Sequence, residues 1–198
     1  MKIAILIIAA GASRRLGQPK QLVPFRDTFL LNHIIQECQN SKVGTIYIVL
    51  GANAERIEPR LPKDLSIFYH KNWKQGMGTS IAFGMQHIDK KDYEGVIIAV
   101  GDQPFFSSFL LKKITQKYIE TNSKIIISEY EEGMGTPSFF EKTLFSELLQ
   151  LKGDIGAKPI IKKYRTEIQG ISFPKGNIDI DTPEDLKLLE NREAFVAK

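Results

Sequence analysis

The chain has 198 residues, of which 42% are hydrophobic and 25% charged, and its formal net charge is +4. This length suits one well-buried core and is short for two independent domains, so we expect one domain over residues 1–198. The basic residues are scattered among 23 acids without a long basic run, which argues against a nucleic-acid-binding surface.

The first expected element is a buried strand over residues 3–8. The opening ten residues superficially resemble a signal peptide, but the apolar run is short and leads directly into a polar loop with arginines. No segment approaches the roughly 18 consecutive apolar residues that span a bilayer. Cys38 is the sole cysteine, which excludes a disulfide within this chain and a thiolate metal site. These features together predict a cytoplasmic protein.

Short β-branched runs then alternate with segments of helical spacing. We expect strands over residues 45–50, 65–69, 95–100 and 124–128, and helices over residues 30–39, 80–88 and 109–120. Continuous apolar strands that alternate with helices are typical of a mostly parallel sheet covered on both faces. The chain is therefore predicted to be an α/β protein.

The pattern is less regular in the last third of the chain. A short extended piece is expected over residues 136–140, followed by helices over 142–150 and 155–164 and a strand over 167–173. A final helix is expected to begin at Asp181 or Thr182, because a capping residue, Pro183 and two acids follow one another there.

The loop after the first strand, residues 9–20, has the composition of an anion site. Its opening Ala9-Ala10-Gly11 lets a ligand approach the backbone at the strand's carboxyl end, where ligands bind in such sheets. It has neither the dinucleotide G-x-G-x-x-G pattern nor the Gly-Lys-Ser/Thr of a Walker loop. Its amides, with Arg14, Arg15 and Lys20, suit a polyphosphate. The alternative is a surface loop with chance cations.

Carboxylates follow two other expected strands. Asp102 ends the strand over residues 95–100 at the same edge of the sheet, where it could hold Mg²⁺ or cap the next helix. Asp179 and Asp181 have the period-two spacing of one face of an extended segment, and either could supply a second metal carboxylate. Helix capping is the competing role of Asp181.

Two glycine-rich turns open expected helices. The turn over residues 72–80 could offer backbone groups and a hydroxyl to a base or ribose, and Trp73 within it is more typical of packing than of stacking. The turn over residues 153–158 is either a simple turn or a second anion site. His33, His70 and His87 lack metal-ligand spacing, and no G-x-S-x-G motif occurs, so zinc and acyl-transfer chemistry are unsupported.

Four motifs together resemble the molybdenum cofactor nucleotidyltransferases of the MobA-like NTP transferase superfamily. They are the loop over residues 9–20, Gly101-Asp102-Gln103-Pro104, Gly153-Asp154-x-Gly156-Ala157 and the segment over residues 179–186. They span almost the whole chain in the family's order. The last two are similar to the cytidylyltransferase branch rather than the guanylyl branch. Leu16 stands where the family usually has methionine, a residue of similar volume.

The resemblance implies a three-layer α/β/α Rossmann-like nucleotidyltransferase fold with a mixed, mostly parallel central sheet. It also implies a Mg²⁺-dependent transferase of molybdenum cofactor biosynthesis, which transfers CMP from CTP to the terminal phosphate of molybdopterin and releases pyrophosphate. By position, the implied catalytic residues are Lys20, Arg15 and Asp102, and the implied metal ligands are Asp102 and Asp181. The implied nucleotide-binding residues are Ala9, Ala10, Gly11, Ser13, Arg14, Arg15, Lys20, Gly78, Thr79, Ser80 and Asp102.

Other functions remain open from the sequence. One is a related NTP transferase that uses another nucleotide, or a sugar phosphate or methylerythritol phosphate as acceptor. Another is a non-catalytic nucleotide-binding factor for the maturation of a molybdenum hydroxylase, although a binding module has no need of the two carboxylates Asp102 and Asp181. A molybdenum hydroxylase is an expected recipient of the product, whereas nucleic acid and membrane are not expected partners.

Overall fold

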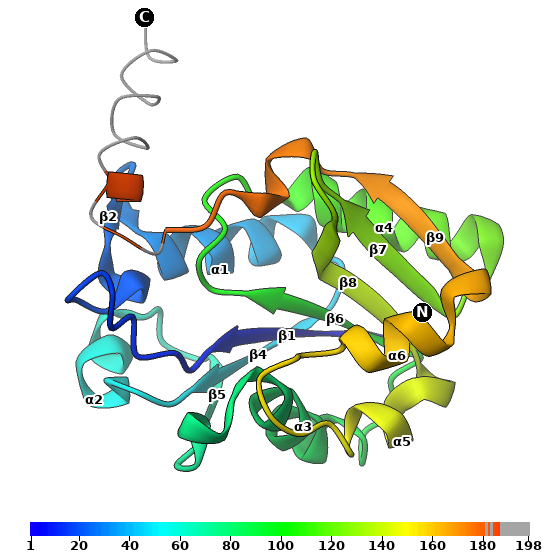
Figure 1. The fold of residues 1–198 in the computed structure, drawn as a ribbon, viewed down its shortest axis with the longest axis horizontal. Coiled ribbons are helices and arrows are strands. Elements are labelled where there is room, and N and C mark those ends of the chain that lie inside the picture. The colour runs from blue at the N-terminus through cyan, green and yellow to red at the C-terminus, as the bar shows by residue number, and fades with distance from the viewer. Residues whose placement is uncertain (181, 183, 187–198) are drawn as a thin grey trace, which may run out of the picture.

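A seven-stranded sheet forms the centre of the computed structural model, which describes residues 1–180, 182 and 184–186. The strand order is β5-β4-β1-β6-β8-β7-β9 (Figure 1). β8 is antiparallel to β6 and β7, and the other neighbouring pairs are parallel. The expected mixed, mostly parallel sheet is thereby confirmed. The strands are β1 (Ile3–Ala9), β4 (Thr45–Leu50), β5 (Ser66–Tyr69), β6 (Gly95–Val100), β7 (Ile125–Glu129), β8 (Met134–Glu141) and β9 (Ile168–Ser172).

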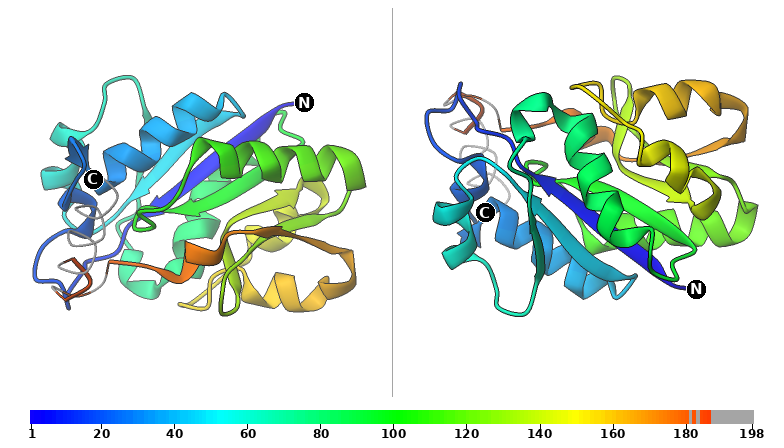
Figure 2. Two further views of the ribbon diagram at one scale, coloured as in Figure 1. Left: turned by 90° about the horizontal axis from the view of Figure 1, so that it is seen from above. Right: turned by 90° about the horizontal axis from the view of Figure 1, so that it is seen from below.

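Helices cover both faces of this sheet (Figures 1 and 2). One face carries α1 (Leu30–Ser41) and α4 (Ser108–Thr121), which pack against each other. The other face carries α3 (Met77–Ile88), α5 (Phe145–Leu148) and α6 (Lys158–Lys163). A short α2 (Ala54–Ile57) follows β4, and the two-residue strands β2 (Pro24–Phe25) and β3 (Thr28–Phe29) form a separate hairpin before α1. The three-layer arrangement is the one expected.

The side chains of β1 explain why its sequence is apolar throughout. All of its residues are buried, with neighbouring strands on both sides. Ile3, Ile5 and Ile7 belong to the core cluster beneath α1 and α4, whereas Leu6 and Ile8 belong to the cluster beneath α3 and α5. Successive strand residues point to opposite faces, so a strand covered on both faces needs apolar residues at every position.

Several boundaries differ from the expected ones. The helix expected from residue 155 begins at Lys158, because Gly156 has φ +58° and interrupts the helical path. The helix expected over residues 142–150 is a 3₁₀ turn (Lys142–Leu144) followed by α5. The extended piece expected over residues 136–140 is the middle of β8, which has eight residues. The β2–β3 hairpin was not predicted, because each of its strands has only two residues.

The parallel centre of the sheet determines where side chains from distant motifs meet. β1, β4 and β6 run in one direction, so the loops that follow them emerge at one edge, toward which the arrowheads point in Figure 1. Within the described residues, no helix has the length and apolar character required to cross a membrane.

Candidate active site

The loop that follows β1 is held in shape from inside the protein by Gln21. This buried side chain donates from Nε2 to the carbonyl oxygens of Ala9 at 2.9 Å and Gly11 at 3.3 Å. Ser13 adopts φ +53°, and its carbonyl oxygen accepts hydrogen bonds from the amides of Leu16 and Gly17. The loop is therefore a fixed turn at the end of a buried strand.

Lys20 and Asp102 join the ends of this loop and of β6. The Lys20 amide donates to the Ser13 hydroxyl at 3.0 Å, and its ammonium group donates to Oδ2 of Asp102. The two charged side chains are only 18% and 15% exposed, so water screens their attraction incompletely. Two motifs that lie 82 positions apart thus form one charged centre.

A first cavity of about 400 Å³ opens around this charged centre. Its floor is formed by the ends of β1 and β6, and its wall by the turn before α3. Ala9, Ala10, Gly11, Arg14, Lys20, Ser80 and Asp102, which are among the predicted nucleotide-binding residues, line it together with Gln21, Trp73, Lys74, Gln75, Gly76, Met77 and Asp154.

Four of the predicted nucleotide-binding residues lie outside this lining. Arg15 is exposed on the same loop, and Ser13 supports the loop from within. The amide of Gly78 donates to the carbonyl oxygen of Gly153 at 2.8 Å, and the hydroxyl of Thr79 donates to the carbonyl oxygen of Gly76 at 2.7 Å. The structure therefore brings Arg14, rather than Arg15, to the cavity.

The two glycine-rich turns of the sequence interlock at the start of α3. Gly76 has φ +107°, and a Cβ atom there would lie 2.5 Å from the carbonyl carbon of Gly153. The amide of Met77 donates to Oδ1 of Asp154 at 3.1 Å. Asp154 thus occupies the amino terminus of α3, which makes the second turn a structural partner of the first.

Ser80 is connected to a buried histidine. Its hydroxyl lies 3.1 Å from Nδ1 of His70, and the His70 ring stacks on Phe83 with a centroid distance of 4.8 Å. Burial lowers the pKa of His70. A neutral imidazole therefore fixes the hydroxyl that faces the first cavity.

A second cavity, of about 300 Å³, lies on the other side of Asp102. It shares Met77, Val100 and Asp102 with the first cavity. Its walls are mainly apolar, and its polar side chains come from the end of β6, the β7–β8 turn, β8, the start of α6 and the segment after β9. The lining includes Gln103, Tyr130, Met134, Thr136, Ile155, Gly176 and Asp179.

The carboxylates at this junction fit a divalent cation. Oδ1 of Asp102 is buried and has no hydrogen-bond partner among the described residues, and Asp179 lines the second cavity beside it. No group of three potential ligands from His, Cys, Asp and Glu comes together in that part of the chain. Mg²⁺ typically takes one or two carboxylates together with substrate phosphates, which suits this donor set. Asp181, the other predicted ligand, lies outside the described residues.

Comparisons with known proteins identify sequences and structures similar to this chain. A sequence profile described as the MobA-like NTP transferase domain matches residues 5–168. The bifunctional protein GlmU of Thermosipho africanus is 28% identical over 191 residues, which are 96% of this chain and 40% of GlmU. The purine catabolism protein PucB of Bacillus subtilis is 25% identical over 195 residues, which are 93% of this chain and 94% of PucB. The chain thus spans less than half the length of GlmU.

Solved structures confirm the fold. The crystal structure of Rv0371c from Mycobacterium tuberculosis H37Rv has a TM-score of 0.84 and 26% sequence identity, and the match covers 96% of this chain and 97% of that one. A structure of Rv0371c in complex with manganese has a TM-score of 0.79 and 24% identity, covering 96% and 98%.

Proposed function

The chain belongs to the MobA-like NTP transferase family and is a nucleotidyltransferase, and on that premise we propose that it transfers CMP from CTP to the terminal phosphate of molybdopterin. The observation that carries this proposal is the meeting of two cavities at Asp102. A transferase must bind a donor and an acceptor side by side, with the reacting atoms between them. The charged first cavity suits the triphosphate, and the more apolar second cavity suits the acceptor.

The main obstacle to this reaction is the electrostatic repulsion between two polyanions, which the cations around the first cavity reduce. Lys20 and Arg14 face the cavity, Arg15 lies exposed on the same loop, and we assign these cations to the triphosphate. Mg²⁺, when bound by Asp102 with Asp179 or Asp181, supplies further positive charge at the phosphates.

The bond changes require no protein nucleophile. An oxygen of the acceptor phosphate attacks the α-phosphorus of CTP and forms a new P–O bond. The bond from that phosphorus to the bridging oxygen breaks, and the oxygen leaves with the electron pair as part of pyrophosphate. A phosphate monoester, with a second pKa of about 6, is largely ionised near neutral pH, so a general base is unnecessary.

The proposed choice of CTP rests on the resemblance of residues 153–157 and 179–186 to the cytidylyltransferase branch. Asp154, from the Gly153–Gly156 turn, lies on the wall of the first cavity and bonds the start of α3, from which Ser80 faces the same cavity. This arrangement supports recognition of the nucleoside of CTP by the two interlocked turns. We further propose that a molybdenum hydroxylase of the xanthine dehydrogenase type receives the product, in line with the name of PucB as a purine catabolism protein.

Pyrophosphate release tests the donor and the acceptor together. CTP, GTP, UTP and ATP are each combined with molybdopterin, a sugar phosphate or methylerythritol phosphate in the presence of Mg²⁺. We expect pyrophosphate to be released only when CTP is combined with molybdopterin. Release that requires another pair of substrates contradicts the proposed specificity.

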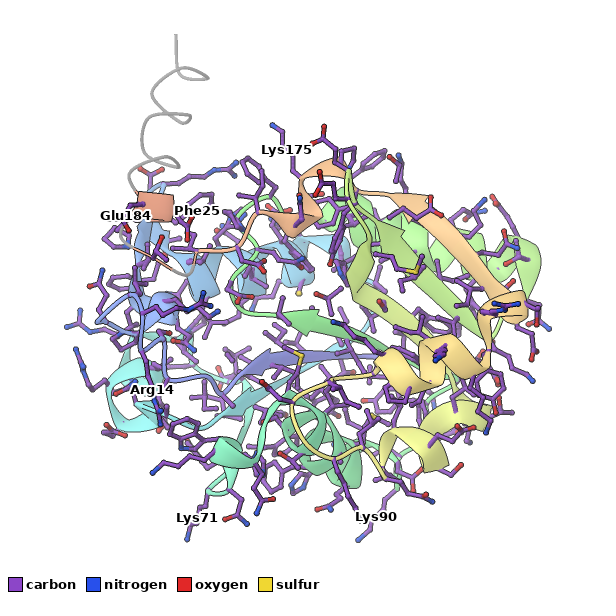
Figure 3. The ribbon with its side chains drawn as sticks, in the orientation of Figure 1. Arg14, Phe25, Lys71, Lys90, Lys175 and Glu184 are labelled. Carbon is purple, nitrogen blue, oxygen red and sulfur yellow. The ribbon has the colours of Figure 1, made fainter. Side chains whose placement is uncertain are left out.

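Two lysine variants serve as a matched pair in this assay. Lys20→Ala should abolish release. Lys90→Ala should keep it, because Lys90 follows the carboxyl end of α3, opposite the cavity, and its side chain points away from the molecule in Figure 3. Equal activity of the two variants contradicts the assignment of the first cavity.

A further inference from the structure

Gln103 is a buried polar side chain beside the central carboxylate, with only 2% of its surface exposed. Its Nε2 donates to the carbonyl oxygen of Gly176 at 2.6 Å and to that of Thr136 at 3.1 Å. It also lies 3.1 Å from the hydroxyl of Tyr130. One amide therefore connects the end of β6 to the start of β8, to the residue after β7 and to the segment after β9.

The pattern of donors and acceptors fixes the orientation of this amide. Nε2 has two hydrogens, and the short bond to Gly176 takes one while Thr136 and Tyr130 share the other. A flipped amide would turn its oxygen toward two carbonyl oxygens and lose both bonds. The hydroxyl of Tyr130 donates its own proton to the carbonyl oxygen of Thr136 at 2.5 Å.

The three segments also meet at very short range around the Tyr130 ring. A Cβ atom on Gly176 would lie 2.1 Å from Cε1 of Tyr130, and one on Gly135 would lie 2.5 Å from its hydroxyl oxygen. Burial raises the pKa of Tyr130, and the nearby charges of Asp179 and Asp102 add to that rise, so the phenol remains a donor. This tie, the connection of the three segments through Gln103 and Tyr130, thus consists of close packing as well as hydrogen bonds.

Each group in this tie borders the same cavity as the two carboxylates. Gln103, Tyr130, Thr136 and Gly176 all line the second cavity, together with Asp102 and Asp179. We propose that Gln103 is a positioning residue that holds the acceptor wall and the Asp179 segment in place beside Asp102. This role rests on the proposed function, since it assigns the second cavity to the acceptor. The loop of the first cavity is held separately by Gln21, so loss of Gln103 should act mainly on the acceptor side.

Steady-state kinetics of Gln103→Met test this role, because methionine keeps the length of the side chain and removes the amide. We expect the KM for molybdopterin to rise about tenfold, as is typical when a residue that orients the groups of a site is lost, and the KM for CTP to change much less. Tyr130→Phe leaves both carbonyl bonds of Gln103 in place and should have a smaller effect.

Ser128→Ala is the control. It removes the buried hydrogen bond from the Ser128 hydroxyl to the carbonyl oxygen of Pro137 at 2.7 Å. This bond joins β7 to β8, and neither residue lines the second cavity. Both KM values should remain those of the wild type. An equal rise of both KM values in Gln103→Met would indicate general destabilisation and overturn the positioning role.

Amide hydrogen exchange supplies a readout that needs no substrate. In Gln103→Met, exchange should accelerate in residues 129–136 and 173–180 and remain unchanged in residues 9–20. Wild-type exchange in the first two segments overturns the positioning role, whatever the reaction is. A wild-type protein that transfers CMP to no acceptor overturns the proposed function instead, and the exchange pattern is unaffected by that failure.

Discussion

Asp102 is the side chain at which the sequence motifs converge. One of its oxygens accepts from Lys20, and the other is buried without a partner in the described part of the chain. Asp102→Ala should lower kcat by about 10²–10³-fold, because it removes preorganised charge from the transfer centre. The melting temperature should change little, since the variant loses one ion pair with Lys20 at the cavity and leaves the apolar core intact. Pyrophosphate release and thermal unfolding measure the two effects.

Asp92→Ala is the matched control for that variant. Asp92 is an acid whose side chain is 81% exposed and pairs with Lys2 at the opposite edge of the sheet. It should retain wild-type kcat. Substantial Mg²⁺-dependent turnover by folded Asp102→Ala would contradict the assignment of Asp102.

His70 predicts a pH dependence of stability. Burial lowers its pKa in the folded protein, so below about pH 6.5 the unfolded chain takes up a proton that the folded chain does not. The free energy of unfolding should therefore fall as the pH drops from about 6.5 toward the lowered folded-state pKa. His70→Gln should flatten this slope in denaturant titrations, and His87→Gln, at an exposed position of α3, should keep it. An unchanged slope in His70→Gln would contradict this origin.

At the scale of elements, two glycines with positive φ should differ in their tolerance of a side chain. Gly17 has φ +75° and open space around it, so Gly17→Ala should cost about 1–2 kcal/mol of unfolding free energy. Gly76 has φ +107° and contacts the backbone of Gly153, so Gly76→Ala should cost roughly 3 kcal/mol or more and weaken CTP binding. Urea unfolding and calorimetry with CTP measure these effects. Equal stability of the two variants would contradict the interlocked turns.

The sequence predicts which segments form helices and strands better than it predicts which of these elements lie side by side. The apolar runs of β1, β4 and β6 mark these strands because burial on both faces requires apolar residues throughout, and the helical spacing of α1, α3 and α4 marks these helices because only one face is buried. The insertion of β8 between β6 and β7 leaves no such mark, since strand order is decided by tertiary packing.

The same limit applies to the site. Lys20 and Asp102 were predictable because both follow a strand at one edge of the sheet. Arg14 could not be separated from Arg15, because an irregular loop has no period that fixes side-chain direction. Gln103 belongs to one of the predicted motifs, but the sequence indicates no role for it because its partners lie 27, 33 and 73 residues away.

At the scale of the whole molecule, exposed apolar side chains gather at the second cavity. Met77, Met134 and Ile155 are 39%, 55% and 58% exposed, and all three line it. Such a rim suits an acceptor with a flat, weakly polar body behind its phosphate. Met134→Asn and Ile155→Asn should each raise the KM for molybdopterin about fivefold, from the loss of roughly 1 kcal/mol of apolar contact. Phe109→Asn, at a 64% exposed position on α4, should change neither KM and serves as the control.

Transfer of the α-phosphorus of CTP to the acceptor is the most direct test of the reaction. CTP labelled with ³²P at that atom is incubated with Mg²⁺, molybdopterin and either the wild type or Asp102→Ala. The label should appear in the molybdopterin product of the wild type, in equal amount to the pyrophosphate released, and stay in CTP with Asp102→Ala. Release of the label as free CMP, or equal transfer by both proteins, would contradict nucleotidyl transfer at the junction of the two cavities.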